Sequence, residues 1–166
     1  MLKKALMISL VGFSAILTAA ESAPPPITLY TPKVCITCID YAEHLRKAGF
    51  VVTIKASDDM DAVKRRLKVP KDVESVPSAT VGAYFVEGHV PADDIKELLR
   101  DKPKARGIAV PGLPMGAPGR EYSAPICDTG CTVLDTDTSV EDRVRRELYN
   151  TLLVKPDGDT SVFNRH

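Results

Sequence analysis

The stretch that decides the fold is residues 27–38, ITLYTPKVCITC. Its first four residues are β-branched, aromatic or aliphatic, a composition that predicts a short buried strand. Apolar side chains then recur at i, i+3, i+4 and i+7, the spacing of one helix face: Cys38, Tyr41, Ala42 and Leu45. Gly49 follows where a helix C-terminal cap belongs. The sequence therefore predicts a strand and then a helix, with Cys35 and Cys38 at the start of that helix.

Further elements continue the alternation toward the C-terminus. We expect a strand, a helix, two strands and a helix, in that order, at residues 50–54, 57–67, 79–81, 84–86 and 91–99. The strand at 50–54 is β-branched and apolar, which predicts burial. Gly82 separates the two strands of a hairpin, and Pro91 suits the first position of the last helix. The order is βαβαββα, and with a dithiol directly after the first strand it resembles the thioredoxin fold.

The last third of the chain is less regular. Residues 106–119 are rich in proline and glycine and show no periodicity, so we expect a loop. A capping box at residues 138–141 predicts an inserted helix. Residues 151–154 and 160–163 flank a Pro-Asp-Gly turn and predict a C-terminal β-hairpin. The predicted fold class is thus α/β: a thioredoxin-like core with a Pro/Gly-rich loop, an inserted helix and a C-terminal hairpin.

The N-terminus predicts export. Residues 1–20 combine a short basic start, a nearly uninterrupted apolar run and a small-residue exit at Ala20, as in a cleavable signal peptide. A retained membrane anchor is the alternative, although the apolar run is short for a span, which needs about 20 residues. We expect a linker at residues 21–26 and a single domain at residues 27–166, with an insertion at about 122–147. The predicted location is the periplasm.

Composition excludes some classes of partner. The chain has 22 basic and 22 acidic residues, and removal of Lys3 and Lys4 with the signal peptide leaves a net charge of −2. Such a balance gives no footprint for nucleic acid and no polybasic segment for a membrane surface. We therefore expect neither partner for the mature protein.

The Cys35–Cys38 pair is the main candidate site. A helix N-terminus carries unpaired amide groups that favour a thiolate, and Lys33 adds positive charge nearby. Cys35 would attack a partner disulfide and Cys38, one turn further, would resolve the mixed disulfide. Two thiolates also form a site for a soft ion such as Cu(I) or Zn(II). A static structural disulfide is the third interpretation.

Two further features extend this site. Pro77 precedes the predicted third strand, where thioredoxins have a cis-proline that faces the dithiol and binds the partner peptide. An ordinary loop proline is the alternative, since few X–Pro bonds are cis. Cys127 and Cys131 form a second pair. They fit a disulfide that pins an irregular segment, a second redox pair, or half of a four-thiolate metal site.

Three histidines and one methionine have less certain roles. His44 lies four residues after Asp40 on the first helix and is predicted to pair with that carboxylate. His89 precedes the last core helix as a candidate ligand or cap. Met115, in the Pro/Gly-rich loop, is a candidate thioether ligand or a packing residue. His166 is terminal and expected to be disordered.

Three strings together resemble one family: EHLRKAGF at 43–50, YFVEGHVPADDI at 84–95 and ARGIAVPG at 105–112. They are similar to the CopG-type copper-associated periplasmic proteins, which have a thioredoxin-like fold. The resemblance runs from about Leu29 to Phe163, with extra sequence around 122–147. It implies copper binding, through a C-x-C-C cluster with further Cys, His and Met ligands.

This chain departs from that ligand set. The first and last cysteines of the cluster match Cys35 and Cys38, but the middle one is Thr37. A Cys-His pair of the family falls on Val76 and Pro77, and two methionines of the family fall on Leu113 and Arg120. The histidine of the Gly-His-Val-Pro motif is kept as His89.

These departures lead us to predict a thiol–disulfide oxidoreductase that needs no cofactor and acts on protein thiols or disulfides through Cys35, Cys38 and Pro77. The alternative is a protein that binds Cu(I) and exchanges it with a copper-handling partner, with ligands from Cys35, Cys38, His89 and Met115. A third interpretation is an interaction domain stapled by two disulfides.

Overall fold

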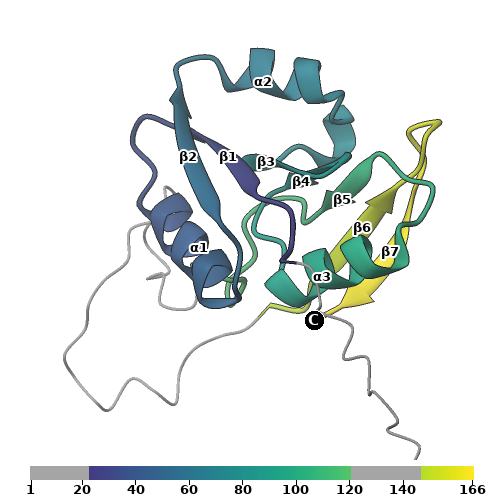
Figure 1. Ribbon diagram of the computed structural model, residues 1–166. Coiled ribbons are helices and arrows are strands. Elements are labelled where there is room, and N and C mark those ends of the chain that lie inside the picture. Colours follow the sequence, from purple (N-terminus) through teal and green to yellow (C-terminus); the bar gives the residue numbers. More distant parts are fainter. Residues whose placement is uncertain (1–22, 121–146) are drawn as a thin grey trace, which may run out of the picture.

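The computed structural model describes residues 23–120 and 147–166 (Figure 1). Its elements are β1 (Ile27–Pro32), α1 (Ile36–Lys47), β2 (Val52–Ser57), α2 (Met60–Leu67), a 3₁₀ turn η1 (Lys71–Val73), β3 (Ser78–Val81), β4 (Tyr84–Glu87), α3 (Ala92–Asp101), β5 (Gly107–Ala109), β6 (Asn150–Val154) and β7 (Thr160–Arg165). The predicted α/β class and its βαβαββα core are confirmed. Within these ranges, no helix is long and apolar enough to cross a membrane.

One sheet of seven strands organises the molecule, in the order β2-β1-β3-β4-β5-β6-β7. Strand β1 pairs in parallel with β2, and β4 in parallel with β5, while the other neighbours are antiparallel. Helices α1 and α3 lie together on one face and α2 lies on the other (Figure 1). Because α1 begins shortly after β1 ends, Cys35 lies at the C-terminal end of β1.

The main core lies between the sheet and the helices α1 and α3. It contains Leu29 from β1, Leu45 from α1, Val86 from β4 and Ile95 from α3, all 0–1 % exposed. Tyr41 of α1 is also fully buried, and its hydroxyl donates to the carbonyl of Val90 at 2.8 Å. This bond satisfies the one polar atom of a large buried ring and ties α1 to the segment after β4.

Two strands differ from expectation. The strand predicted as buried at 50–54 is observed at Val52–Ser57, and most of its side chains are exposed because β2 is an edge of the sheet. The Pro/Gly-rich segment predicted as a loop contains the short strand β5, buried throughout. Three residues are too few to show a period in sequence, and this strand is held by pairing with β4 and β6.

The C-terminal hairpin is confirmed as β6 and β7. Most of the predicted inserted helix lies outside the described residues. Leu148, the last apolar position of that prediction, is not helical and is 94 % exposed.

A buried carboxylate fastens the hairpin to α3. Asp94 accepts hydrogen bonds from the hydroxyl of Thr151, from Asn164 Nδ2 at 2.8 Å and from His166 Nε2 at 2.9 Å. Its side chain is 5 % exposed. His166 was expected to be disordered, but it is held by this contact and by its ring against Tyr149. Besides the pairing of β6 with β5, the hairpin is thus joined to the core by the polar bonds of Asp94 and by the bond from Asn164 to Glu97 at 2.9 Å.

Replacement of Asp94 should therefore lower stability strongly. Asp94→Ala removes the acceptor of the Thr151 and His166 side chains, while Asn164 keeps its bond to Glu97. We expect a loss of about 2–4 kcal/mol in the free energy of unfolding, measured with urea. Asp93→Ala is the matched control, because the Asp93 side chain is 93 % exposed and its loss should cost less than about 0.5 kcal/mol. Equal losses in the two variants would contradict this role.

Candidate functional site

The two cysteines of the first helix form a disulfide whose Cα atoms are 5.3 Å apart. Cys35 is the N-cap of α1, and Cys38 lies in its first turn. Cys35 is partly exposed, whereas Cys38 is 1 % exposed. A partner can therefore reach only one of the two sulfurs, as the predicted division into attacking and resolving cysteine requires.

The start of α1 favours negative charge on Cys35. No acidic residue lies in the first turn of the helix, so nothing opposes its unpaired amide groups, which stabilise a thiolate. The expected help from Lys33 is smaller than predicted. Its ammonium group lies 2.7 Å from Asp58, and both side chains are mostly exposed, so this charge is paired and screened by water.

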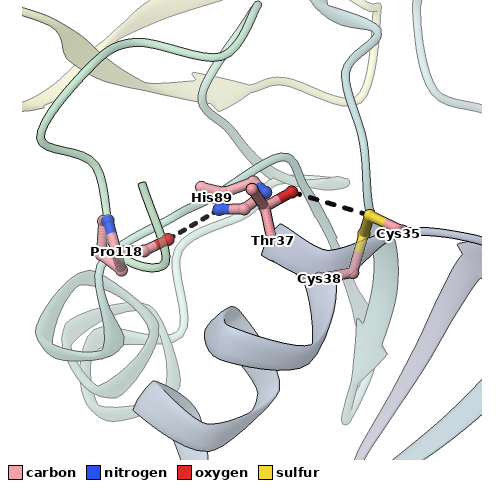
Figure 2. The surroundings of a disulfide bond; sticks show 5 residues. All are labelled: Cys35, Thr37, Cys38, His89 and Pro118. Carbon is pink, nitrogen blue, oxygen red and sulfur yellow. Dashed lines mark hydrogen bonds between the residues drawn. A yellow bond between two sulfur atoms is a disulfide. The ribbon is translucent and has the colours of Figure 1, made fainter. Parts of the chain in front are cut away.

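His89 is the histidine that the fold brings to the dithiol. Its ring lies between the carbonyl of Pro118 and the first turn of α1, with Thr37 between the ring and Cys35 (Figure 2). His89 is fully buried, and its Nδ1 lies 2.6 Å from the Pro118 carbonyl oxygen. A carbonyl only accepts, so Nδ1 carries the proton and Nε2 presents a lone pair. Nε2 has no hydrogen-bond partner among the described residues.

Burial also fixes the charge of this ring. Desolvation is the main cause that lowers the pKa of His89 to about 4; the bond to Pro118 opposes it, and the positive charge of Arg120 adds to it. The imidazole is therefore neutral at physiological pH. A neutral imidazole with a free nitrogen is the form that binds metal ions.

The Pro/Gly-rich loop carries Pro118 to this position because it packs directly on α1. A Cβ atom on Gly119 would lie 2.8 Å from the backbone nitrogen of Tyr41 and 2.9 Å from the carbonyl oxygen of Thr37. Gly119 also has a φ of +80°, which favours glycine. The Tyr41 ring lies against His89, with centroids 4.9 Å apart. Only glycine permits this close approach.

Pro77 contacts the backbone next to His89. The Val76–Pro77 bond is cis, as the resemblance to thioredoxins led us to expect. The Pro77 carbonyl accepts from the backbone N–H of Gly88 at 2.7 Å, so the turn before β3 contacts the residue before His89.

His44, another candidate, contacts the start of α3. His44 Nε2 accepts from the backbone N–H of Ala92 at 3.2 Å, so His44, and not His89, caps α3. The Met115 backbone hydrogen-bonds to Glu147, and its thioether stays a predicted ligand. Cys127 and Cys131 lie outside the described residues. Within those residues, no three His, Cys, Asp or Glu side chains are arranged to hold a metal ion, and both described cysteines are in the disulfide.

Comparisons with known proteins identify one family model and two solved structures that are similar to this chain. Residues 73–120, from η1 to the end of the Pro/Gly-rich loop, match a family described as "Protein of unknown function, DUF411". Two solved structures of the copper resistance protein CopG, forms 1 and 2, are 34 % identical to the chain, with TM-scores of 0.69 and 0.70. Each alignment covers 86 % of this chain and 98 % of the CopG chain. No curated protein matches.

The chain belongs to the CopG family. This confirms the family named from the sequence, and the structure shows what the departures do to the site. Arg120 stands where the family resemblance implies a methionine. It is only 9 % exposed, and its Nε has no partner among the described residues. A guanidinium near His89 repels further cations. Among the described residues, Cys35, Cys38 and His89 are the kept positions of the ligand set that the family resemblance implies, and Met115 stays a predicted ligand.

Several residues of this CopG site escaped the sequence analysis. Pro118 acts through its carbonyl, which leaves no pattern in sequence. The buried ion pair between Lys64 and Glu87, by contrast, can be recognised from a pattern in the sequence. Lys64 falls on the apolar face of α2, four residues after Met60, and Glu87 shares a strand face with Phe85. A charge on a buried face was the available signal.

The low pKa of His89 predicts acid sensitivity. Below pH about 6.5, its ordinary pKa, the unfolded chain takes up a proton on His89 that the folded protein does not bind until about pH 4. His89 therefore lowers stability as pH falls through this window, by about 2–3 kcal/mol at pH about 4.5. Urea unfolding of the oxidised protein at pH about 7 and about 4.5 measures it. His89→Gln should lose less stability on acidification than wild type, and equal losses would contradict a buried neutral His89.

Proposed function

We propose that this protein handles copper, by binding Cu(I) with the reduced thiolates of Cys35 and Cys38 and with Nε2 of His89. The observation that carries the proposal is the buried Nε2 lone pair of His89, which has no hydrogen-bond partner among the described residues. Figure 2 shows this ring on the far side of Thr37 from Cys35. A buried polar atom without a partner costs free energy. A ligand that supplies the missing partner removes that cost.

The donor set suits this ion. Thiolates select soft ions such as Cu(I), and a neutral imidazole is a common further ligand. His89 needs no deprotonation at neutral pH, because burial already keeps it neutral. Reduction of the disulfide frees both sulfurs, and binding then releases the thiol protons. The copper resistance function named for the related CopG structures supports the same cargo.

We infer one copper ion at this site and not a cluster. Thr37 replaces the central cysteine that the family resemblance implies, and Arg120 places a buried cation close to His89. The first change removes a soft ligand, and the second adds positive charge. Copper would thus be a cargo bound by Cys35, Cys38 and His89 once reduction has separated the two sulfurs, and exchange with a partner would proceed at the partly exposed Cys35.

Copper titration tests this assignment. We expect the reduced protein, in a Cys127→Ser/Cys131→Ser background, to bind one Cu(I) in competition with a chromophoric Cu(I) chelator. Cys35→Ser/Cys38→Ser should abolish binding, and His89→Gln should weaken it about tenfold or more, the loss of at least about 1.4 kcal/mol.

His166→Gln is the control, because His166 contacts Asp94 on the C-terminal hairpin and not the dithiol. It should bind Cu(I) as the background protein does. Cu(I) affinity of Cys35→Ser/Cys38→Ser equal to that of the background protein would contradict the proposal.

A second candidate function is thiol–disulfide exchange, favoured by the exposed Cys35 beside a buried Cys38. The Cys35 thiolate would attack one sulfur of a partner disulfide, forming a mixed disulfide and releasing one partner thiolate. Cys38 would then attack Cys35, closing the internal disulfide and releasing the second partner thiolate. Two electrons pass to the partner.

This candidate predicts trapped intermediates. In the Cys127→Ser/Cys131→Ser background and with a model protein disulfide, Cys38→Ser should stop at a mixed disulfide detectable by mass, and Cys35→Ser should not react. A wild-type rate no higher than that of Cys35→Ser would remove this function while leaving copper binding untouched. We further propose that the chain acts after export to the periplasm, and that Cys127 and Cys131 serve as a second redox pair.

A further inference from the structure

Glu87 is a buried carboxylate that neither proposed function uses. It ends β4 and is 0 % exposed. Its Oε1 accepts the backbone N–H of Ser75 at 2.8 Å and lies 3.4 Å from the ammonium of Lys64, which comes from α2. The other oxygen, Oε2, has no partner among the described residues. The bond to Ser75 and the ion pair with Lys64 are thus both made through Oε1, while the buried side chain of Ser78 also acts on the carboxylate.

Ser75 begins the turn that leads to Pro77, and this turn packs against the residue before His89. The Ser75 hydroxyl donates to the carbonyl of Gly112, and the Pro77 carbonyl accepts from Gly88 at 2.7 Å. A Cβ atom on Gly88 would lie 2.3 Å from the carbonyl oxygen of Val110 and 2.9 Å from Ser75 Oγ. Gly88 is therefore enclosed between the turn and the chain after β5.

We propose that Glu87 is a positioning residue for His89: by accepting the Ser75 amide it holds the 75–77 turn against Gly88, and so fixes the backbone from which the His89 ring reaches the dithiol. This inference rests on the proposed Cu(I) site. The role is geometric, because Glu87 is two residues from His89 and touches neither cysteine in its hydrogen bonds. Lys64 compensates the buried charge of Glu87, and its ammonium also lies 3.8 Å from the carboxylate of Glu74, which is 19 % exposed.

The test compares two variants that differ only in the acceptor. Lys64→Met/Glu87→Met removes the charges and the acceptor, and Lys64→Met/Glu87→Gln removes the charges but keeps an oxygen for Ser75. Neutral residues of similar volume at a buried ion pair usually preserve folding. Both are made in the Cys127→Ser/Cys131→Ser background and titrated with Cu(I) in the reduced state. We expect the Met/Met variant to bind about tenfold more weakly, as residues that orient a ligand do, and the Met/Gln variant to bind as the background protein does.

A double-mutant cycle separates positioning from general damage. Adding His89→Gln to the Met/Met variant should weaken binding no further than His89→Gln alone, because both changes remove the same interaction. Additive losses, or equal affinities of the Met/Met and Met/Gln variants, would overturn the positioning role.

A copper-free readout keeps this inference separate from the proposed function. The NMR signal of the His89 Nδ1 proton, bonded to Pro118, should persist in the Met/Gln variant and be lost or shifted in the Met/Met variant. An unchanged signal in both would overturn the role of Glu87 even if Cu(I) binds. Changed signals together with no His89 dependence of Cu(I) binding would uphold the positioning and contradict the ligand assignment.

Discussion

The hydrogen bond between His89 Nδ1 and the Pro118 carbonyl determines the chemistry of this site. It assigns the ring proton to Nδ1 and leaves a lone pair on Nε2, and burial keeps the imidazole neutral. The bond exists because Gly119 lets the Pro/Gly-rich loop lie on α1. A side chain at that glycine would move the carbonyl, and the tautomer of His89 would no longer be fixed.

This constraint links the family scaffold to a reduced donor set. The chain keeps the dithiol at the start of α1 and the histidine after β4, but a threonine and a buried arginine replace softer groups nearby. Electrostatics and ligand count both favour a single monovalent ion over a cluster. The partly exposed Cys35 beside a buried Cys38 also suits thiol exchange, so under the two proposed functions copper loading and disulfide formation would compete for one pair of sulfurs.

The sequence predicted the parts that depend on local pattern. Helix periodicity located α1, α2 and α3, and the cysteines, Pro77 and His89 were all recognised as candidates. It failed where pairing between distant segments decides: β5 is stabilised by its neighbours, and β2 is exposed because it is an edge. The backbone partners of His44 and His89 were also missed: a backbone N–H bonds to His44, and a backbone carbonyl bonds to His89. Backbone groups carry no residue-specific signal.

The most direct measurement is X-ray absorption at the copper edge of the reduced, Cu(I)-loaded protein in the Cys127→Ser/Cys131→Ser background. Two sulfur ligands and one imidazole nitrogen on a single copper ion are the result that the proposed site predicts. A purely sulfur environment that does not change in His89→Gln, or a copper–copper scattering path, would contradict it.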